Sequence, residues 1–296
     1  MDASVAVPRS AIASIVFLET KVPESHPSAS ILGRERLGAG VAVAPDRVLT
    51  AHYLVMGAES VEVAGIDGKN RAVQRVTLDH ETGLALIVVE GPALMPAVVG
   101  PSHSVAPGLP VFLLTCTGER ERKGATGHVS AVGPFEAFWE YMLDRAIMTT
   151  AINPGLAGGP LFDLDGRVIG VVSLALASVG RYSLAIPMDL YLREREWLEG
   201  GDSPRAPRAW IGFYPQGYDG GVVLSGVLPG GPADKAGLER GDLILSVEGQ
   251  PVASLRELYR VLWRKRPGEA LGFQILRDSS LRVVDVIAGD RYEFFK

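Results

Sequence analysis

The sequence has a single cysteine, Cys116, in a chain of 296 residues. One cysteine excludes an internal disulfide. Such sparse use fits a reducing compartment, although many exported bacterial proteins also lack cysteines. Cys116 ends the apolar stretch 111–116, which is typical of a buried strand. We therefore interpret it as a small core residue rather than a reactive thiol.

The sequence also lacks a strong excess of one charge and long apolar runs. The formal net charge is −5 and no run of five like charges occurs, so we expect no nucleic-acid partner. No apolar stretch is long enough to span a membrane, and residues 1–9 carry an acid where a signal peptide would be basic. We expect a cytoplasmic protein if the chain is full length, and a periplasmic or extracytoplasmic one if a signal segment was removed.

Glycine and proline are abundant instead, with 35 and 20 residues. They make up roughly a fifth of the chain, against an average of about 12%. This composition favours tight turns and short strands over long helices, and the length is sufficient for two domains with separate cores. We therefore expect a mostly β protein.

Residues 11–200 contain short apolar or alternating runs separated by turn signals, as a β-barrel domain requires. The doublet Asp165-Gly166 predicts a hairpin turn, and residues 189–198 predict a short amphipathic helix. The clearest predicted strands are 13–18, 38–43, 84–89, 110–115, 126–132 and 168–174.

The run 151–161 carries the most specific motif in this part of the chain. It reads Ala-Ile-Asn-Pro-Gly-Leu-Ala-Gly-Gly-Pro-Leu and resembles the nucleophile loop Asn-Pro-Gly-Asn-Ser-Gly-Gly-Pro-Leu of HtrA-type, trypsin-like serine proteases. In that loop glycines allow a sharp turn that points two backbone N–H groups into an oxyanion hole beside the serine oxygen. The resemblance puts Ala157 in the place of the serine. Gly155, Leu156 and Ala157 would then form a residual oxyanion loop without a nucleophile.

The other two members of the family's catalytic triad are missing as well. Residues 48–58 resemble the family segment Val-Leu-Thr-Ala-Ala-His-Val-Val-x-Gly-Ala, and without a gap the general base falls on Tyr53. Residues 76–86 resemble the segment that ends in Asp-Leu-Ala-Val, with Gly83 in the place of the aspartate. Engineering rarely removes three members, so the resemblance predicts a naturally inactive site with no catalytic residues.

His52 lies one residue before the expected base and raises two alternatives. A slipped site could pair it with Asp79 or Glu81, but Ala157 would still offer no nucleophilic oxygen. A metal site could combine His52, His80 and the same two acids, but the spacing is not of the helical or zinc-finger kind. Adjacent acids and histidines on a surface turn are more often solvated, so we expect neither a metal nor a cofactor.

Three serines are candidate replacement nucleophiles, Ser104, Ser173 and Ser183. Ser104 opens a turn, and the other two lie in or beside apolar strands. None follows a turn that would aim its oxygen at an oxyanion hole, so we interpret all three as hydrogen-bonded structural residues.

A different pattern begins after residues 201–207, which we interpret as a linker. Residues 221–227, 231–238 and 240–252 resemble a PDZ domain of the circularly permuted bacterial type. Ser254 is the predicted N-cap of a helix whose apolar residues recur at helical spacing. Two further predicted strands, around 272–276 and 281–287, complete the domain.

A PDZ domain binds the end of an extended peptide by adding it as a strand to a sheet edge beside a helix. Residues 208–213 resemble the aromatic-x-Gly-hydrophobic carboxylate loop of HtrA-linked PDZ domains. In this resemblance Gly212 lets the main chain curl around the terminal carboxylate, Ile211 and Phe213 line the side-chain pocket, and Trp210 is the aromatic residue. The alternative is that Trp210 simply starts a core strand.

These features predict a mostly β chain, with a chymotrypsin/trypsin-like double β-barrel at 1–200, a linker at 201–207, an α+β PDZ domain at 208–290 and a tail at 291–296. The predicted function is a pseudoprotease that binds peptide or protein C-termini and uses the protease fold as a scaffold or peptide-holding cleft. Its expected ligand has a hydrophobic C-terminus, and a second copy or an active HtrA homologue is a further candidate partner. The alternative is a serine-type endopeptidase with an unconventional active site.

Overall fold

The computed structural model describes residues 8–176, 182–200 and 206–296. Contacts divide the chain into two compact units. Unit 1 contains residues 1–133 and 144–203, and unit 2 contains residues 134–143 and 204–296. Most of the expected linker at 201–207 lies outside the described residues.

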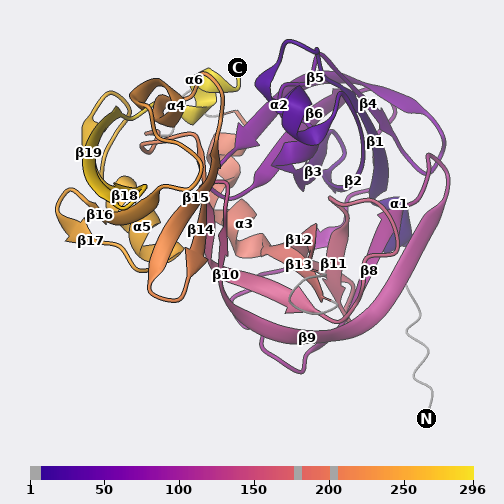
Figure 1. The fold of residues 1–296 in the computed structure, drawn as a ribbon. Coiled ribbons are helices and arrows are strands. Elements are labelled where there is room, and N and C mark those ends of the chain that lie inside the picture. Colours follow the sequence, from indigo (N-terminus) through magenta and orange to yellow (C-terminus); the bar gives the residue numbers. More distant parts are fainter. Residues whose placement is uncertain (1–7, 177–181, 201–205) are drawn as a thin grey trace. The chain divides into compact units, whose positions relative to one another are not determined.

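Unit 1 begins with a closed antiparallel barrel, formed by the indigo and purple strands of Figure 1. The register places Leu49 opposite Val41 on one side and Leu86 on the other, and all three side chains are buried. Helices α1 (Arg9–Ala13) and α2 (Pro27–Leu32) precede its first and second strands. The barrel order is β1 (Ile15–Lys21), β2 (Glu35–Ala44), β3 (Arg47–Ala51), β6 (Leu84–Glu90), β5 (Asn70–Asp79) and β4 (Ser60–Ala64).

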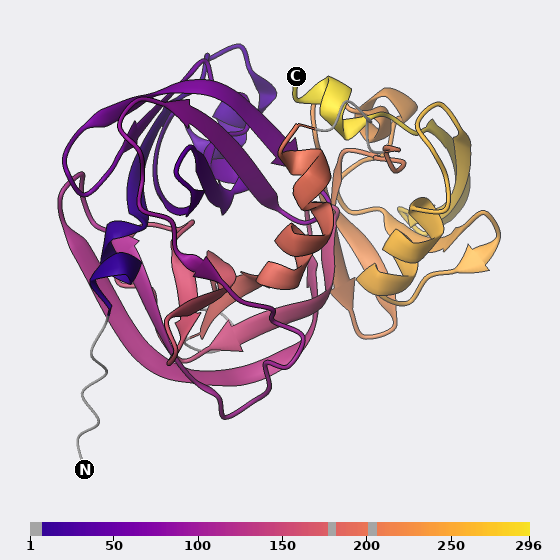
Figure 2. The same ribbon diagram turned by 180° about the vertical axis from the view of Figure 1, so that it is seen from behind.

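A second sheet follows, and pairing of its strand β11 with β12 closes a ring. Apolar residues such as Leu113, Ile147 and Leu161 fill its core. Helix α3 (Met188–Leu198) contacts strands of both barrels, and Figure 2 shows its full length. The sheet order is β11 (Pro160–Asp163), β8 (Pro110–Cys116), β9 (Arg122–Ala137), β10 (Tyr141–Thr149), β13 (Tyr182–Pro187), β12 (Arg167–Leu176) and β7 (Val98–Val99).

The secondary structure expected for residues 11–200 is confirmed. Each of the six predicted strands overlaps an observed strand, and the predicted helix is α3. Asp165-Gly166 lies in the turn between β11 and β12. The closed barrel and the second, ring-closing sheet agree with the double β-barrel expected for this part of the chain.

Unit 2 contains one sheet in which β14 is an edge strand. Ser254 caps α5 as predicted, because its hydroxyl accepts a hydrogen bond from the Glu257 N–H at 3.2 Å. The sheet order is β14 (Phe213–Tyr218), β15 (Gly221–Val227), β16 (Leu243–Val247), β18 (Ala270–Arg277) and β19 (Ser280–Ile287); β17 (Gln250–Pro251) pairs with β16, and the helices are α4 (Pro232–Ala236) and α5 (Leu255–Leu262).

Two further segments belong to unit 2. Residues 291–296, expected as a tail, contain the short helix α6 (Arg291–Phe294). The rings of Phe294 and Phe295 pack against Trp210 at centroid distances of 4.7 and 5.8 Å. Residues 134–143, the end of the β9–β10 hairpin, were expected to lie with the barrel, and the contacts group them with unit 2.

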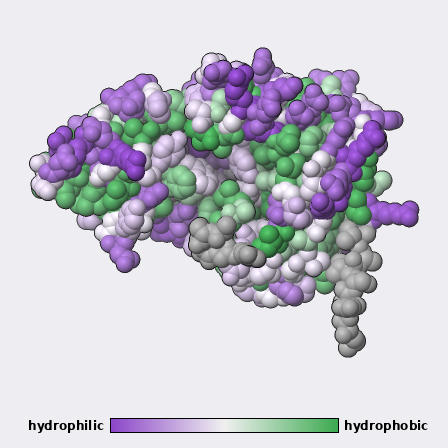
Figure 3. Space-filling model, turned by 45° about the vertical axis from the view of Figure 1, so that its right-hand side comes forward, coloured by the Kyte–Doolittle hydropathy of each residue, from purple (hydrophilic) through white to green (hydrophobic). Residues whose placement is uncertain are grey.

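The surface seen in Figure 3 mixes apolar (green) and polar (purple) side chains in several separate areas. Among the described residues no helix is both long and apolar enough to cross a membrane.

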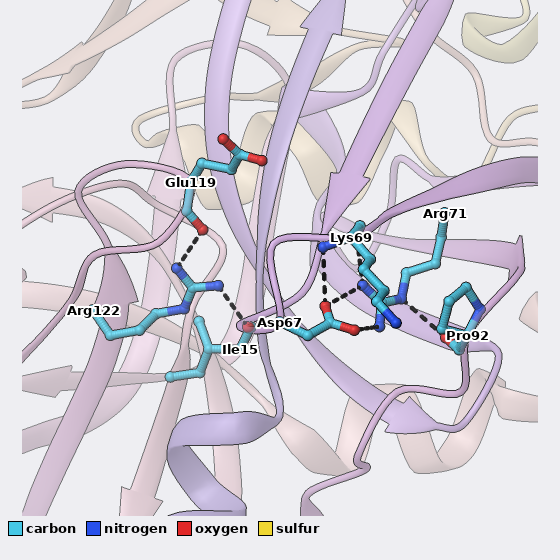
Figure 4. Close-up of polar contacts among 7 residues, drawn as sticks. All are labelled: Ile15, Asp67, Lys69, Arg71, Pro92, Glu119 and Arg122. Atoms are coloured by element: carbon cyan, nitrogen blue, oxygen red, sulfur yellow. Dashed lines mark hydrogen bonds and ion pairs between the residues drawn. The ribbon is translucent and has the colours of Figure 1, made fainter.

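Two arginines bind loops and strands of unit 1 (Figure 4): Arg71 lies in β5 of the first barrel, and Arg122 lies in β9 of the second sheet. Arg71 donates from Nη1 and Nη2 to the Asp67 carboxylate at 2.8 and 3.0 Å, and from Nε to the Pro92 carbonyl at 3.0 Å. The hydrogen bond from Arg71 lowers the pKa of Asp67 to about 2. Arg122 donates to the carbonyls of Ile15 and Glu119 at 3.1 and 2.9 Å.

We expect Arg71→Met to lower the free energy of unfolding by about 0.5–1.5 kcal/mol, because the Pro92 carbonyl and the partly exposed Asp67 carboxylate lose their donors. The Asp67 carboxylate contributes above the pKa of about 3.9 for an unfolded aspartate, and its contribution is lost as pH falls towards 2. Urea unfolding followed by circular dichroism should show the difference from wild type shrinking between pH 4 and 2. Lys69→Met, which changes an exposed side chain, is the matched control. Equal stability of wild type and Arg71→Met at pH 7 would contradict this role.

Candidate functional site

Tyr53 lies in the 3₁₀ turn η1 (His52–Leu54), directly after β3. Its hydroxyl donates a hydrogen bond to the Ser173 carbonyl in β12 at 2.7 Å. Burial raises the pKa of Tyr53 to about 12, against the lowering effect of this hydrogen bond. A phenol that keeps its proton and donates it to a carbonyl is not a general base near neutral pH. At this position the side chain therefore has a structural contact.

His52 is buried beside Gly83 rather than replacing Tyr53. Its backbone N–H donates to the Gly83 carbonyl at 2.9 Å, and its Nδ1 lies 3.2 Å from the same oxygen. A carbonyl can only accept, so that second contact requires a protonated Nδ1. The His80 ring meets His52 edge-on at a centroid distance of 5.4 Å. The structure thus brings His52 together with Gly83, the residue expected in the place of the aspartate.

Asp79 is fully buried and organises the turn that leads to Gly83. Its carboxylate accepts hydrogen bonds from the Glu81 N–H at 2.9 Å and from the Thr82 hydroxyl at 2.7 Å. The Gly83 N–H donates to the Asp79 carbonyl at 2.9 Å, which closes the turn. These contacts give Asp79 a structural role in the turn. Within the described parts of the chain, no group of three or more His, Cys, Asp or Glu residues is arranged to hold a metal.

The loop 151–161 keeps a defined turn through bonds to its own side chains. The Asn153 side chain accepts from the Gly155 N–H at 3.2 Å and donates to the Leu156 carbonyl at 3.1 Å. The Leu156 N–H donates to the Cys116 carbonyl at 2.9 Å. Gly155 is one of the residues expected to form the residual oxyanion loop, and its N–H is engaged inside the loop.

The glycine after Ala157 is required by close packing. Gly158 has φ +92°, and a Cβ atom there would lie 2.0 Å from the Ala39 carbonyl oxygen. The Ala157 carbonyl accepts from the Ala39 N–H at 2.7 Å, and the Gly158 N–H donates to the Val172 carbonyl at 2.7 Å. The turn is therefore fixed against β2 and β12, with a methyl group at position 157.

The three serines considered as replacement nucleophiles lie in different elements and have different contacts. Ser183 accepts from the Asn153 N–H through its Oγ at 2.9 Å, and its side chain is buried. Ser173 provides the carbonyl that Tyr53 contacts, and Ser104 lies exposed between β7 and β8. Two of these serines thus support neighbouring elements of the site.

A second candidate site is the segment before β14. Gly212 has φ +75°, so its main chain turns in a conformation that glycine adopts readily. Ile211 and Phe213 are buried within the core of unit 2, and Trp210 packs on α6. Three consecutive N–H groups, those of residues 211, 212 and 213, point to one carboxylate.

That carboxylate belongs to Glu140, at the end of the β9–β10 hairpin. Burial raises the pKa of Glu140 to about 7, although the three N–H donors and the charge of Arg291 act in the opposite direction. The sequence analysis missed this residue. Nothing local distinguishes Glu140 from an ordinary acid at a hairpin turn, because its partner residues follow some 70 positions later.

Comparisons with known proteins agree with this architecture. Residues 38–171 match the family model of the trypsin-like peptidase domain, and residues 209–287 match that of the PDZ domain. Two curated relatives carry the name "Probable periplasmic serine endoprotease DegP-like". The one from Ectopseudomonas mendocina is 30% identical over 294 residues, covering 92% of this chain and 61% of that protein. The one from Halomonas elongata is 31% identical over 276 residues, covering 87% and 57%. The chain spans about three fifths of the length of these relatives.

Solved structures share the fold. The serine endoprotease from Yersinia pestis has a TM-score of 0.59 at 24% identity, covering 95% of this chain and 96% of that chain. The HtrA-type protease AlgW, solved with a decapeptide, has a TM-score of 0.58 at 24% identity with the same coverage.

We expect Tyr53→Phe to lower the free energy of unfolding by about 1–2 kcal/mol, because the Ser173 carbonyl loses its donor while the ring remains. Urea unfolding is the measurement. Tyr218→Phe is the matched control, since the Tyr218 side chain is 62% exposed. If both variants match wild type, the Tyr53–Ser173 contact does not stabilise the fold.

Proposed function

Because the chain combines an HtrA/DegP-type trypsin-like peptidase domain with a PDZ domain, we propose that it is a pseudoprotease whose PDZ domain binds peptide or protein C-termini. The trypsin-like domain then serves as a scaffold or peptide-holding surface. The degenerate positions are Tyr53, Gly83 and Ala157.

The observation that carries the first half of this proposal is the engagement of Tyr53. Its hydroxyl donates to the Ser173 carbonyl at the position of the general base, while Ala157 offers no nucleophilic oxygen. In trypsin-like enzymes, removal of triad members leaves only about 10³–10⁴-fold enhancement over water. A site without base, orienting aspartate and nucleophile is therefore expected to be inert.

Three features support peptide binding. The N–H groups of residues 211–213 converge on a carboxylate, as they would on a peptide C-terminus. Strand β14 is a sheet edge with α5 in contact beside it, which suits the addition of a peptide strand. The related protease AlgW was solved with a decapeptide.

The alternative is a serine-type endopeptidase with an unconventional site. Its support is that the curated relatives are named serine endoproteases and that His52 lies beside Gly83. A second copy or an active homologue remains a proposed partner. The relatives' names place them in the periplasm, which favours an extracytoplasmic location.

We expect purified protein to remain unlabelled by a fluorophosphonate serine probe and to leave casein intact. The triple variant Tyr53→His, Gly83→Asp, Ala157→Ser should gain labelling, whereas single changes should do little because the triad acts as a unit. The matched control carries the first two changes with Ala157 retained and should stay unlabelled. Stoichiometric labelling of wild type would establish the endopeptidase alternative instead.

We expect the full chain to bind peptides with a free hydrophobic C-terminus and to bind their amidated forms much more weakly, because charge-assisted bonds to backbone N–H groups are lost. An affinity around micromolar, about −8 kcal/mol, suits a short added strand. Gly212→Val should distort the loop, because φ +75° disfavours a β-branched residue. Peptide affinity should therefore fall strongly, whereas the melting temperature should change little. Gly230→Val is the matched control, with φ +74° and open space around it. Equal calorimetric binding of acid and amide forms would remove this loop from the site.

A further inference from the structure

The end of the β9–β10 hairpin presents a side-chain carboxylate to the loop 211–213. Glu140 Oε1 accepts from the Gly212 N–H at 2.6 Å and from the Phe213 N–H at 3.3 Å. Its Oε2 accepts from the Ile211 N–H at 3.0 Å. A glutamate side chain and a peptide C-terminus offer the same pair of carboxyl oxygens as acceptors. One set of N–H groups cannot hold both at once.

The hairpin is also held on both sides of Glu140. The Tyr259 hydroxyl of α5 donates to the Ala137 carbonyl and accepts from the Glu140 N–H, the latter at 3.2 Å. Arg291 of α6 donates to the Glu140 carbonyl at 3.2 Å. Arg256 of α5 forms a 2.6 Å ion pair with Glu136. All of these contacts lie within unit 2.

The backbone of Glu140 adds an independent observation. Its φ is +55°, in the left-handed region that non-glycine residues occupy only sparsely. A residue persists in this conformation where its surroundings over-determine it. Here the surrounding contacts are those of the main chain with Tyr259 and Arg291 and of the carboxylate with the loop.

We propose that Glu140 is an internal ligand of the PDZ carboxylate loop, so that a partner's free C-terminus binds only after displacing the hairpin end. This proposal rests on the proposed peptide-binding function. The domain is then self-occupied, and the ligand class that releases it is an extended peptide with a terminal carboxylate. An internal segment without a carboxylate lacks the group needed to replace Glu140.

The charged and titratable groups that face Glu140 are Arg291, Tyr259 and Tyr214. Burial raises the pKa values of both tyrosines above their usual range and lowers that of Arg291. The guanidinium group stays charged near neutrality, so Glu140 is the group among them that titrates there. The docked carboxyl keeps its proton up to its pKa of about 7, whereas a released carboxyl loses it near pH 4.3. Docking of Glu140 is therefore strongest below about pH 4.3, weakens as pH rises from there to about 7, and is constant above about pH 7.

The test compares the wild-type chain with Glu140→Gly, because glycine accepts φ +55° and removes the side chain that carries the carboxylate. By calorimetry at pH 6, an octapeptide with a free hydrophobic C-terminus should bind the variant at least tenfold more tightly than wild type. Asp144→Ala is the matched control: it removes an exposed carboxylate from β10 of the same hairpin, four residues after Glu140, and should change affinity less than threefold. Equal affinity of wild type and Glu140→Gly would overturn the proposal.

A second measurement keeps this proposal separate from peptide binding itself. In a ¹H–¹⁵N spectrum without peptide, the Gly212 amide should shift with pH near 7 in wild type and lose that titration in Glu140→Gln. If neither protein binds peptide but the amide shows this behaviour, the peptide-binding function fails and the internal ligand stands. If the Gly212 amide is the same in both proteins, the internal ligand is wrong whatever the peptide does.

The pH dependence gives a third outcome. For wild type, affinity for the free-acid peptide should rise at least threefold between pH 5 and 7.5, while Glu140→Gln should stay constant because its amide does not titrate. The peptide's own carboxyl is ionised over this whole range. A fall in wild-type affinity over the same interval would contradict the proton linkage.

Discussion

Both candidate sites depend on one constraint: each backbone N–H group in a sharp turn needs a hydrogen-bond acceptor. Sheet pairing cannot satisfy these groups, because the chain leaves the strand direction there. In the barrel loop the Gly155 N–H donates to the Asn153 side chain. Before β14 three N–H groups donate to Glu140. Turns that could hold an incoming oxygen are thus filled by oxygens of the chain itself.

Contacts hold the barrel at the positions proposed to be degenerate. Tyr53 donates to the Ser173 carbonyl, and the Gly83 carbonyl accepts from His52. The turn at Ala157 is fixed by bonds of its main chain to β2 and β12, which do not involve its side chain. Fold and function are separable for this reason, since main-chain bonds hold the frame and side chains supply the chemistry.

The sequence was sufficient for features encoded locally. The resemblance of residues 151–161 to a protease loop predicted a sharp turn there, and continuous apolar runs predicted β6 and β8. The sequence could not predict contacts between residues that are far apart in the chain. The partner of Tyr53 is a main-chain carbonyl 120 residues away, and a carbonyl leaves no mark on the sequence. Glu140 could not be assigned to the loop because its contact depends on where the hairpin end lies, which alternation and turn chemistry do not encode.

The proposed occupancy of the loop by Glu140 alters how peptide affinity for this PDZ domain should be understood. When only a fraction of molecules has a vacant loop, the apparent dissociation constant is the intrinsic one divided by that fraction. Contacts that hold the hairpin, such as that between Tyr259 and Ala137, therefore affect peptide affinity by setting the vacant fraction. The coupling is reciprocal. A bound C-terminus weakens docking of the hairpin end by the same factor by which the docked hairpin weakens peptide affinity. Peptide affinity and hairpin docking are consequently two measures of one equilibrium.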